Sequence, residues 1–292
     1  MHKSVLLNET LEFLKCENKQ AVLDCTVGGG GHAQEILKNL PPGGRLIGID
    51  ADEKALEIAK ENLKNFKGAF VPVKENFRNF DKVLNDLGID SVDAMLFDLG
   101  ISSFQLEDGE RGFSFSNKGP LDMRMDRGLG EPLWQKLNRL SEDELGRIIR
   151  DFGEERYWRR IARALMEEKR ISPIKDTFRL ADIVRRSIRY RSGTRTDQAT
   201  RTFQAFRIFI NDELGALREA LGKAGGFLKK DGRIVVISFH SLEDRIAKQT
   251  FKDLALQGAI SILTKKPITP SEGERIENPR SRSAKLRAAQ RL

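Results

Sequence analysis

Three aspartates in the first third of the chain each stand at the end of a short run of apolar residues. Asp24 follows AVL, Asp50 closes RLIGID and Asp98 closes AMLFD. Four consecutive glycines, at positions 28–31, come shortly after the first of these runs. Such runs predict buried parallel strands, and the carboxyl ends of neighbouring parallel strands meet at the edge of a sheet where ligands bind. We therefore expect the three carboxylates and the glycine turn to form one binding site.

The glycine turn favours a nucleotide-like cofactor. Glycine lets the backbone come close to a ligand, and the N-terminus of the helix expected at 31–40 offers N–H groups to an anion. The pattern G-x-G-x-x-A that starts at Gly28, with Asp50 downstream, also fits a dinucleotide such as NAD. Asp24, however, would face the pyrophosphate of NAD, whereas it suits the sulfonium and ammonium groups of S-adenosylmethionine. The loop from Asp24 to Gly30 resembles the first motif of class I methyltransferases, with Thr26 where glycine is commoner.

Three side chains near the turn have expected contacts with S-adenosylmethionine. Asp50 accepts hydrogen bonds from the ribose, and Phe77 lies against the adenine, where stacking is worth about 1–3 kcal/mol. His32 stands at the start of the helix, so its ring or its backbone N–H contacts the cofactor carboxylate. Each residue also has an alternative role, because Asp50 could cap a helix, Phe77 could belong to the core and His32 could be solvated.

Asp98 is the candidate catalytic residue. An exocyclic amine of a nucleobase is a poor nucleophile, because its lone pair is delocalised into the ring. A carboxylate that accepts the N–H bonds of this amine helps to localise the lone pair, and the site then has only to align the amine with the S–CH3 bond. This chemistry needs no covalent nucleophile, and neither Cys16 nor Cys25 is placed to act as one. A helix cap is the alternative role of Asp98.

Helices and strands alternate around these residues. Strands are expected at 21–26, 45–50, 70–73, 93–99, 233–238 and 259–264, with helices at 31–40, 53–66 and 80–87 between the first four. This order is typical of a doubly wound α/β sheet, here a Rossmann-like methyltransferase sheet. No buried strand is expected from 107 to 198, where helices are predicted at 142–152, 157–169 and 178–189, and a long helix at 203–221 follows. We therefore expect a discontinuous methyltransferase domain, 1–106 and 199–292, and an inserted helical substrate-recognition domain, 107–198.

Length and composition limit the class of protein. The chain has 292 residues, two cysteines and three histidines, so neither a disulfide framework nor a metal site is expected. No apolar run reaches the roughly 20 residues of a membrane span, and the amino terminus lacks the pattern of a signal peptide. We expect a cytoplasmic protein. Its oligomeric state stays open, with a homodimer as one alternative.

The net charge of +8 is unevenly distributed along the chain. Between 185 and 207 there is one acid, Asp197, and aromatic residues are interleaved with arginines. The seven arginines of this stretch are Arg185, Arg186, Arg189, Arg191, Arg195, Arg201 and Arg207. The stretch 280–291 adds five basic residues and no acid. Arginine pairs with phosphate and aromatic rings stack on unpaired bases, so both stretches predict a nucleic-acid substrate.

Motifs along nearly the whole chain strengthen this interpretation. DCTVGGGGHA, IGIDAD, DLGISSFQL, RGFSF, GPLDMRMD, ATRTFQAFRI, ISFHSLEDR and NPRSRSAKLR together resemble the ribosomal RNA small-subunit methyltransferase H family, also called MraW. The resemblance implies S-adenosylmethionine-dependent methylation of cytidine N4 in 16S rRNA of the small ribosomal subunit. It also implies that the cofactor contacts are Gly30, Gly31, His32, Asp50, Phe77, Asp98 and Gln105. The family has His-Pro where this chain has Asp197-Gln198. This difference concerns the details of substrate contact and not the chemistry.

Two other hypotheses stay open. An NAD-dependent oxidoreductase is supported by the glycine pattern and Asp50, but the chain lacks an evident pair of residues for hydride transfer. A non-catalytic RNA-binding protein on a related fold is the second, and the three intact acids Asp24, Asp50 and Asp98 argue against it.

Overall fold

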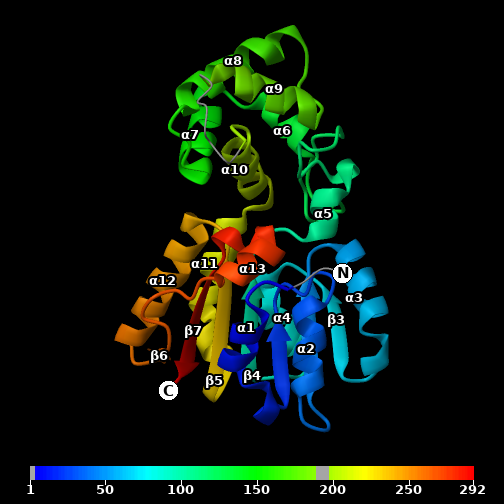
Figure 1. The fold of residues 1–292 in the computed structure, drawn as a ribbon, viewed down its shortest axis with the longest axis vertical. Helices are drawn as coiled ribbons and strands as arrows, with labels where there is room; N and C mark the ends of the chain where they lie inside the picture. Colours follow the sequence, from blue (N-terminus) through cyan, green and yellow to red (C-terminus); the bar gives the residue numbers. More distant parts are fainter. Residues whose placement is uncertain (1–3, 189–196) are drawn as a thin grey trace. The chain divides into compact units, whose positions relative to one another are not determined.

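The computed structural model describes residues 4–188 and 197–292, which form two compact units. One unit, the sheet unit, comprises Met1–Gly100 and Leu214–Leu292, and the other, the helical unit, comprises Ile101–Glu213. Figure 1 shows the strands gathered in the first unit and helices alone in the second. Each unit has its own apolar core.

A seven-stranded sheet with the order β3-β2-β1-β4-β5-β7-β6 forms the centre of the sheet unit. The strands are β1 (Ala21–Asp24), β2 (Arg45–Asp50), β3 (Phe70–Lys74), β4 (Val92–Asp98), β5 (Leu228–Ser238), β6 (Ile260–Ile262) and β7 (Lys285–Arg291). The strands β1 to β5 pair in parallel, whereas β7 is antiparallel to both β5 and β6. Because β1 lies between β2 and β4, the carboxyl ends of these three strands are neighbours.

Helices pack on the sheet through apolar stripes. They are α1 (Leu7–Leu14), α2 (Gly31–Asn39), α3 (Glu53–Asn62), α4 (Phe80–Asp86), α11 (Glu213–Ala224) and α12 (Ser241–Leu256), whereas the short α13 (Glu272–Glu277) has no buried residue. Leu14, Ile36 and Leu56 from the first three of these helices share one buried cluster with Val22 and Leu96 of the central strands. This packing fixes the start of α2 against the end of β1, where the glycine turn lies.

The six predicted strands are all present, but the sequence did not predict β7. The segment KLRAAQR was interpreted as a polar, basic stretch, yet Leu286, Ala288 and Ala289 are fully buried in the sheet. Two small alanines between charged residues carry too little apolar signal for a strand to be recognised. The predicted long helix at 203–221 is also wrong, because Asp212 has a left-handed backbone (φ 48°) that ends α10 (Thr200–Asn211) before α11 begins.

In the part of the chain that the structure describes, the helical unit packs six α-helices around a second core. These are α5 (Ser103–Glu107), α6 (Leu133–Arg139), α7 (Glu142–Gly153), α8 (Trp158–Ile171), α9 (Thr177–Ser187) and α10. Phe203 and Phe206 of α10 are buried in this core. The unit therefore extends beyond the predicted insertion at 107–198, because α5 and α10 belong to it rather than to the sheet unit.

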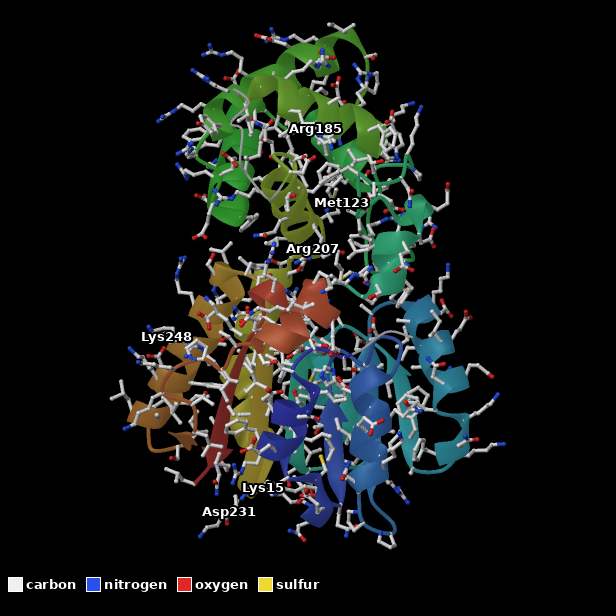
Figure 2. All side chains as sticks on the ribbon, viewed as in Figure 1. Lys15, Met123, Arg185, Arg207, Asp231 and Lys248 are labelled. Atoms are coloured by element: carbon white, nitrogen blue, oxygen red, sulfur yellow. The ribbon has the colours of Figure 1, made fainter. Side chains whose placement is uncertain are left out.

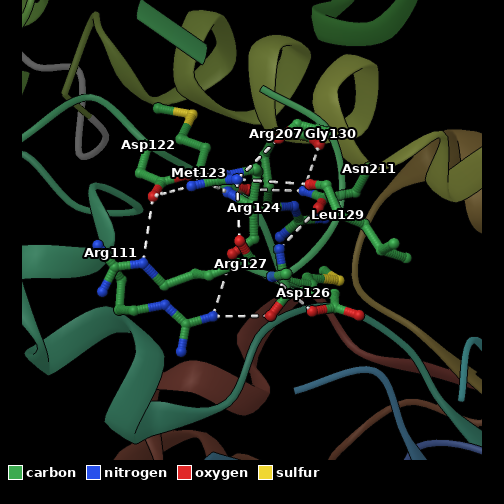
Figure 3. Close-up of polar contacts among 12 residues, drawn as sticks. Arg111, Asp122, Met123, Arg124, Asp126, Arg127, Leu129, Gly130, Arg207 and Asn211 are labelled. Atoms are coloured by element: carbon green, nitrogen blue, oxygen red, sulfur yellow. Dashed lines mark hydrogen bonds and ion pairs between the residues drawn. The ribbon is translucent and has the colours of Figure 1, made fainter. Parts of the chain in front are cut away.

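The loop between α5 and α6 is held by buried charges rather than by regular structure (Figure 3). Asp122 is buried and pairs with Arg124 (Nε to Oδ1 2.6 Å) and with Arg127 (Nε to Oδ2 3.2 Å). Met123 has a left-handed backbone (φ 60°), and its carbonyl accepts a hydrogen bond from Asn211 of α10 (2.8 Å). The motif GPLDMRMD therefore fixes this loop on the helical unit.

Candidate cofactor and active site

The three acids lie together at the carboxyl edge of the sheet, as the sequence predicts. Asp24 ends β1 and pairs in register with Gly48 of β2 and Leu96 of β4. Asp50 and Asp98 are the last residues of β2 and β4, two residues beyond those partners. The carboxylates of Asp50 and Asp98 interact electrostatically with that of Asp24. This edge of the sheet unit is thus an acidic site.

Asp24 is the most deeply buried of the three acids. Its side chain is only 1% exposed and accepts a hydrogen bond from the backbone N–H of Thr26 (3.0 Å). Burial raises the pKa of Asp24 to about 7, and the charges of Asp98 and Asp50 act in the same direction. The hydrogen bond from Thr26 and the nearby His32 oppose this shift. A ligand with a positive charge would favour the ionised form of Asp24, because an opposite charge compensates its burial.

Asp50 shapes the glycine turn through its carboxylate. One oxygen accepts the N–H of Gly28 (2.9 Å) and the other accepts the N–H of Asp52 (2.8 Å). Gly28 (φ 53°) and Gly30 (φ 87°) both have left-handed backbones, which other residues rarely adopt. Asp52 caps α3 by accepting the N–H of Lys54, so the alternative role predicted for Asp50 falls to Asp52.

The helix α2 begins directly behind the turn and presents backbone donors there. Its N-cap is Gly30, which has no side chain and makes no side-chain capping bond. The first N–H groups of an α-helix have no acceptor within the helix. Together with the helix dipole, these donors make the start of α2 suitable for an anionic group. Gly31 and His32 are the first two residues of the helix, so the predicted contact with the cofactor carboxylate would use their backbone N–H groups.

The imidazole of His32 is committed to partners within the protein. The side chain is buried, with Nε2 3.0 Å from the carbonyl oxygen of Val5 and Nδ1 3.2 Å from Oδ2 of Asp98. Burial opposes the charged imidazolium, but the charge and hydrogen bond of Asp98 outweigh it and raise the pKa of His32. The alternative of a solvated histidine is wrong. The ring also has no nitrogen left for the cofactor carboxylate.

Asp98 has one carboxylate oxygen with a partner and one without. Its Oδ2 faces His32, and its backbone N–H donates to Oγ1 of Thr26 (2.7 Å). Its Oδ1 is buried and has no hydrogen-bond partner among the described residues. An acceptor that is buried and unpaired costs free energy and calls for an explanation. A donor from a bound ligand is the explanation that fits an oxygen at this edge of the sheet.

Phe77 and Gln105 complete the predicted cofactor contacts. Phe77 follows β3, is half-buried, and meets the ring of Phe97 edge-on with 6.0 Å between centroids. Gln105 belongs to the helical unit, where it is buried and its side chain accepts the N–H of Ser102 in a capping box at the start of α5 (2.9 Å). The adenine contact of Phe77 and the cofactor contact of Gln105 remain predictions.

Sequence reasoning missed the contribution of Thr26. Its hydroxyl ties the loop after β1 to the end of β4, because it accepts the backbone N–H of Asp98, 72 residues further along the chain. The only signal was a hydroxyl residue where the motif usually has glycine. The link between His32 and Asp98 was missed for the same reason, since neither residue type nor spacing reveals a pairing over such a distance.

The cysteines and metal ligands give no alternative chemistry in the described parts of the chain. Burial raises the pKa of the Cys16 thiol to about 12 and that of Cys25 well above its usual value, so both thiols are protonated at neutral pH. Residues 4–188 and 197–292 contain no cluster of three or more metal-ligating side chains. No helix among them is long and apolar enough to cross a membrane.

Three of the four described arginines in the stretch predicted as a nucleic-acid surface have acidic partners. Arg185 of α9 pairs with Asp197 (2.8 Å), and Arg207 of α10 pairs with Glu213 (2.8 Å); Figure 2 labels both arginines. Arg186 pairs with Asp182 (2.7 Å). Arg189, Arg191 and Arg195 lie outside the described residues. Arg201 donates to the backbone carbonyl of Glu154 (3.1 Å), and the nucleic-acid contact of this stretch remains a prediction.

The second predicted basic stretch, 280–291, is also largely structural. Its last seven residues form β7, and Arg287 is buried there with its Nε 2.7 Å from Oδ1 of Asp244 on α12. Lys285 reaches the same carboxylate at 3.4 Å. These two cations compensate a partly buried acid, and the nucleic-acid contact of this stretch remains a prediction.

The sheet and its acidic edge define the class of the protein. A dinucleotide-binding sheet has six strands in the order 3-2-1-4-5-6. Here an antiparallel β7 lies between β5 and β6, and a glycine turn with a buried acid follows β1. The sheet unit is a Rossmann-like class I methyltransferase.

Comparison with known proteins gives the family. The model of the MraW methylase family matches residues 1–292, and the chain belongs to this family. Proteins named ribosomal RNA small subunit methyltransferase H are similar over the whole chain. They include that of Clostridium botulinum strain Loch Maree (44% identity, covering 100% of this chain and 99% of the relative) and that of Sulfurihydrogenibium azorense (48%, covering 100% and 99%). That of Thermotoga neapolitana is 48% identical and covers 99% and 95%. The oxidoreductase hypothesis is therefore wrong.

Proposed function

We infer that this protein transfers a methyl group from S-adenosylmethionine to the N4 amine of a cytidine in 16S rRNA of the small ribosomal subunit. Membership of the MraW methylase family and the name shared by its relatives support the reaction and the substrate. The single observation that carries the chemistry is the buried, unpartnered Oδ1 of Asp98 at the end of β4. An amine N–H is the kind of donor that this oxygen lacks.

The acidic edge fits the cofactor. Bound there, S-adenosylmethionine supplies a methyl group activated by a positively charged sulfur. The ionised carboxylate of Asp24 compensates that positive charge. The positive charge in turn favours the ionised form of Asp24, which burial and two neighbouring acids oppose. The N–H groups of Gly31 and His32 bind the cofactor carboxylate, and Gly30 allows the close approach. Asp50 binds the ribose and Phe77 contacts the adenine, and Gln105 is a further contact implied by family resemblance.

Asp98 is the residue that acts on the amine. Its Oδ1 accepts an N–H of cytidine N4 and so favours the lone pair pointing at the methyl group. N4 would accept the methyl group that S-adenosylmethionine supplies, the sulfur would leave as the neutral thioether, and one proton of N4 would pass to water. His32 holds Oδ2, so the carboxylate cannot rotate freely. Positioning and electrostatics are sufficient for this reaction.

The two units divide the work. The sheet unit is the methyltransferase domain, and the helical unit recognises the RNA. The substrate places the reaction in the cytoplasm, where ribosomal subunits are assembled. Light scattering on the purified protein distinguishes a monomer from a homodimer.

Methyl transfer to small ribosomal subunits tests this function. Subunits that lack their native modifications are incubated with labelled S-adenosylmethionine, and the product nucleoside is identified by mass spectrometry. We expect N4-methylcytidine at one site. Label on adenine N6 or on protein would overturn the proposed substrate while keeping the cofactor, and binding of the cofactor without any transfer would favour the non-catalytic hypothesis.

A further inference from the structure

Four arginines, called the stripe below, lie at the start of α8. Arg159, Arg160 and Arg163 are exposed on the helix, and Arg156 is exposed in the turn just before it. Because Arg163 follows Arg160 by three residues and Arg159 by four, these three lie on the same side of the helix. They span about 6 Å of helix, which matches about two nucleotides of one strand.

Aromatic rings hold two of these arginines in place. The guanidinium of Arg159 lies 4.4 Å from the centre of the Trp158 ring, and that of Arg156 lies 4.7 Å from the centre of the Tyr157 ring. The hydroxyl of Tyr157 also accepts a hydrogen bond from Arg156 (2.7 Å). A guanidinium that stacks by its face keeps its N–H donors in the plane, where they are available to a phosphate.

The packing beneath Trp158 makes this arrangement rigid. Gly146 of α7 leaves room for the indole, since a Cβ there would lie 2.8 Å from its Cζ3 atom. Arg150, also on α7, lies 5.5 Å from the centre of the same ring and pairs with Asp151. The indole is therefore fixed between two helices of the helical unit, and with it the position of Arg159.

The stripe has almost no acidic compensation, in contrast to Arg185 and Arg186 of α9. Among the described residues, no carboxylate lies within 4.0 Å of Arg156, Arg159 or Arg160, and Glu142 only reaches 4.0 Å from Arg163. Like charges three and four residues apart destabilise a helix, and cations in its first turn oppose its dipole. The charges of Arg159, Arg160 and Arg163 therefore slightly disfavour the helix, and an anionic partner would compensate them.

We propose that Arg156, Arg159, Arg160 and Arg163 bind consecutive phosphates of the RNA substrate. This inference rests on the proposed function for the identity of the polyanion. It assigns the phosphate contacts to α8 and the turn before it, and it makes Tyr157 and Trp158 supports that set the direction of the guanidinium groups. The arginines of α9, which share their charge with Asp197 and Asp182, do not take part.

Two matched double variants test this assignment. R159Q/R160Q removes two charges from the stripe, and R185Q/R186Q removes two charges from adjacent arginines of the same unit that have acidic partners. The affinity of each protein for an unmodified transcript of small-subunit rRNA is measured from 50 to 200 mM salt. Each lost phosphate contact reduces the salt slope by about 0.7, so the deficit of R159Q/R160Q relative to wild type should be about sevenfold larger at 50 mM than at 200 mM. The control should keep the wild-type slope.

Methyl transfer by the same variants separates this proposal from the proposed function. We expect R159Q/R160Q to raise KM for the RNA without changing kcat or the dissociation constant of the cofactor. If wild type methylates small subunits but R159Q/R160Q keeps the wild-type salt slope and KM, the stripe is not a phosphate site. If wild type itself methylates no RNA, the proposed function fails first. A thermal melt identifies a variant that is merely unfolded, and R156Q/R163Q then provides an independent test of the same surface.

Discussion

The acids of the sheet unit were predicted from their positions at strand ends, and the arginines of the helical unit were predicted from a run of like charges; the structure arranges the two sets differently. Asp24, Asp50 and Asp98 lie together at one edge of the sheet. Arg185 and Arg207, in contrast, are taken up by internal ion pairs. A strand end fixes where a side chain must lie, whereas a run of like charges does not show which members have partners elsewhere in the chain. The local sequence therefore shows where a charged side chain lies, but it does not show whether that side chain is free to bind a ligand.

The largest effect should come from Asp98. Asp98→Asn preserves the shape of the side chain but removes the charge that localises the amine lone pair and pairs with His32. We expect kcat to fall by about 10²–10³-fold, as for loss of one electrostatic group at a reacting centre. Single-turnover methyl transfer at saturating cofactor and RNA measures it, with cofactor affinity from isothermal titration as the control. Near-normal turnover in this variant would remove Asp98 from the reaction.

Substitution of Arg287 tests an arginine to which we assign a structural role. Burial alone would raise the pKa of Asp244, but Arg287 and Lys285 hold it below its usual value. Arg287→Ala should lower the free energy of unfolding by about 2 kcal/mol, less than for a fully buried pair because Lys285 remains. Urea unfolding measures this loss, and the exposed Arg282→Ala is the control, expected to stay within about 0.5 kcal/mol.

The pH dependence of the same variant follows from the direction of that shift. A depressed pKa means that the pair stabilises the protein above the unfolded pKa of aspartate, about 3.9, and that this contribution is lost as the pH falls through the folded value. The difference between wild type and Arg287→Ala should therefore shrink below about pH 4. RNA affinity at neutral pH should not change, and a weaker RNA complex would return Arg287 to the nucleic-acid surface.

The fold could be predicted where apolar runs are continuous. The strands β1, β2 and β4 consist almost entirely of large buried residues, so their ends and the acids that follow are visible in the sequence. The strand β7 is not, because its buried Ala288 and Ala289 are small and stand among charges. The end of α10 was missed because a left-handed aspartate, Asp212, breaks a pattern that otherwise continues.

The sequence predicts where each residue of the site lies, but it does not predict the contacts between them. The sequence indicates a glycine turn and three acids, since each lies at the end of a strand or the start of a helix. It does not indicate that His32 contacts Asp98, or that Thr26 accepts the N–H of Asp98, because these contacts join segments more than 60 residues apart. Such pairings depend on the order of strands in the sheet, which no local pattern specifies.

A smaller effect, on cofactor affinity, is expected for substitution of Asp50, whose carboxylate has two roles. It orients the glycine turn through Gly28 and Asp52, and we assign it to the ribose. Asp50→Asn should weaken cofactor binding by about tenfold or more, the cost of one hydrogen bond to a charged group. Isothermal titration with S-adenosylhomocysteine measures this, and RNA affinity should stay nearly unchanged. An unaltered dissociation constant would remove Asp50 from the ribose.

The smallest expected effect is on the pH dependence of turnover, because the charge of His32 positions the carboxylate of Asp98. The pKa of His32 is raised in the folded protein, so the imidazolium and its bond to Asp98 are complete below the ordinary pKa of about 6.5 and are lost as the pH rises through the folded value. Turnover of wild type should therefore decline at alkaline pH. His32→Gln can donate to Val5 or to Asp98 but cannot carry charge, so it should lack this decline and be several-fold slower at neutral pH.

A role in positioning predicts more than a loss of rate in this variant. The backbone N–H at position 32 remains in His32→Gln, so cofactor affinity should be preserved while kcat falls, and KM for the RNA should not change. Isothermal titration and pH profiles of kcat from 6 to 9 separate these quantities. An alkaline decline that persists in the variant would show that another group titrates. Catalysis at the acidic edge would then not depend on the charge of His32. The contact with Asp98 would only compensate the burial of the imidazolium.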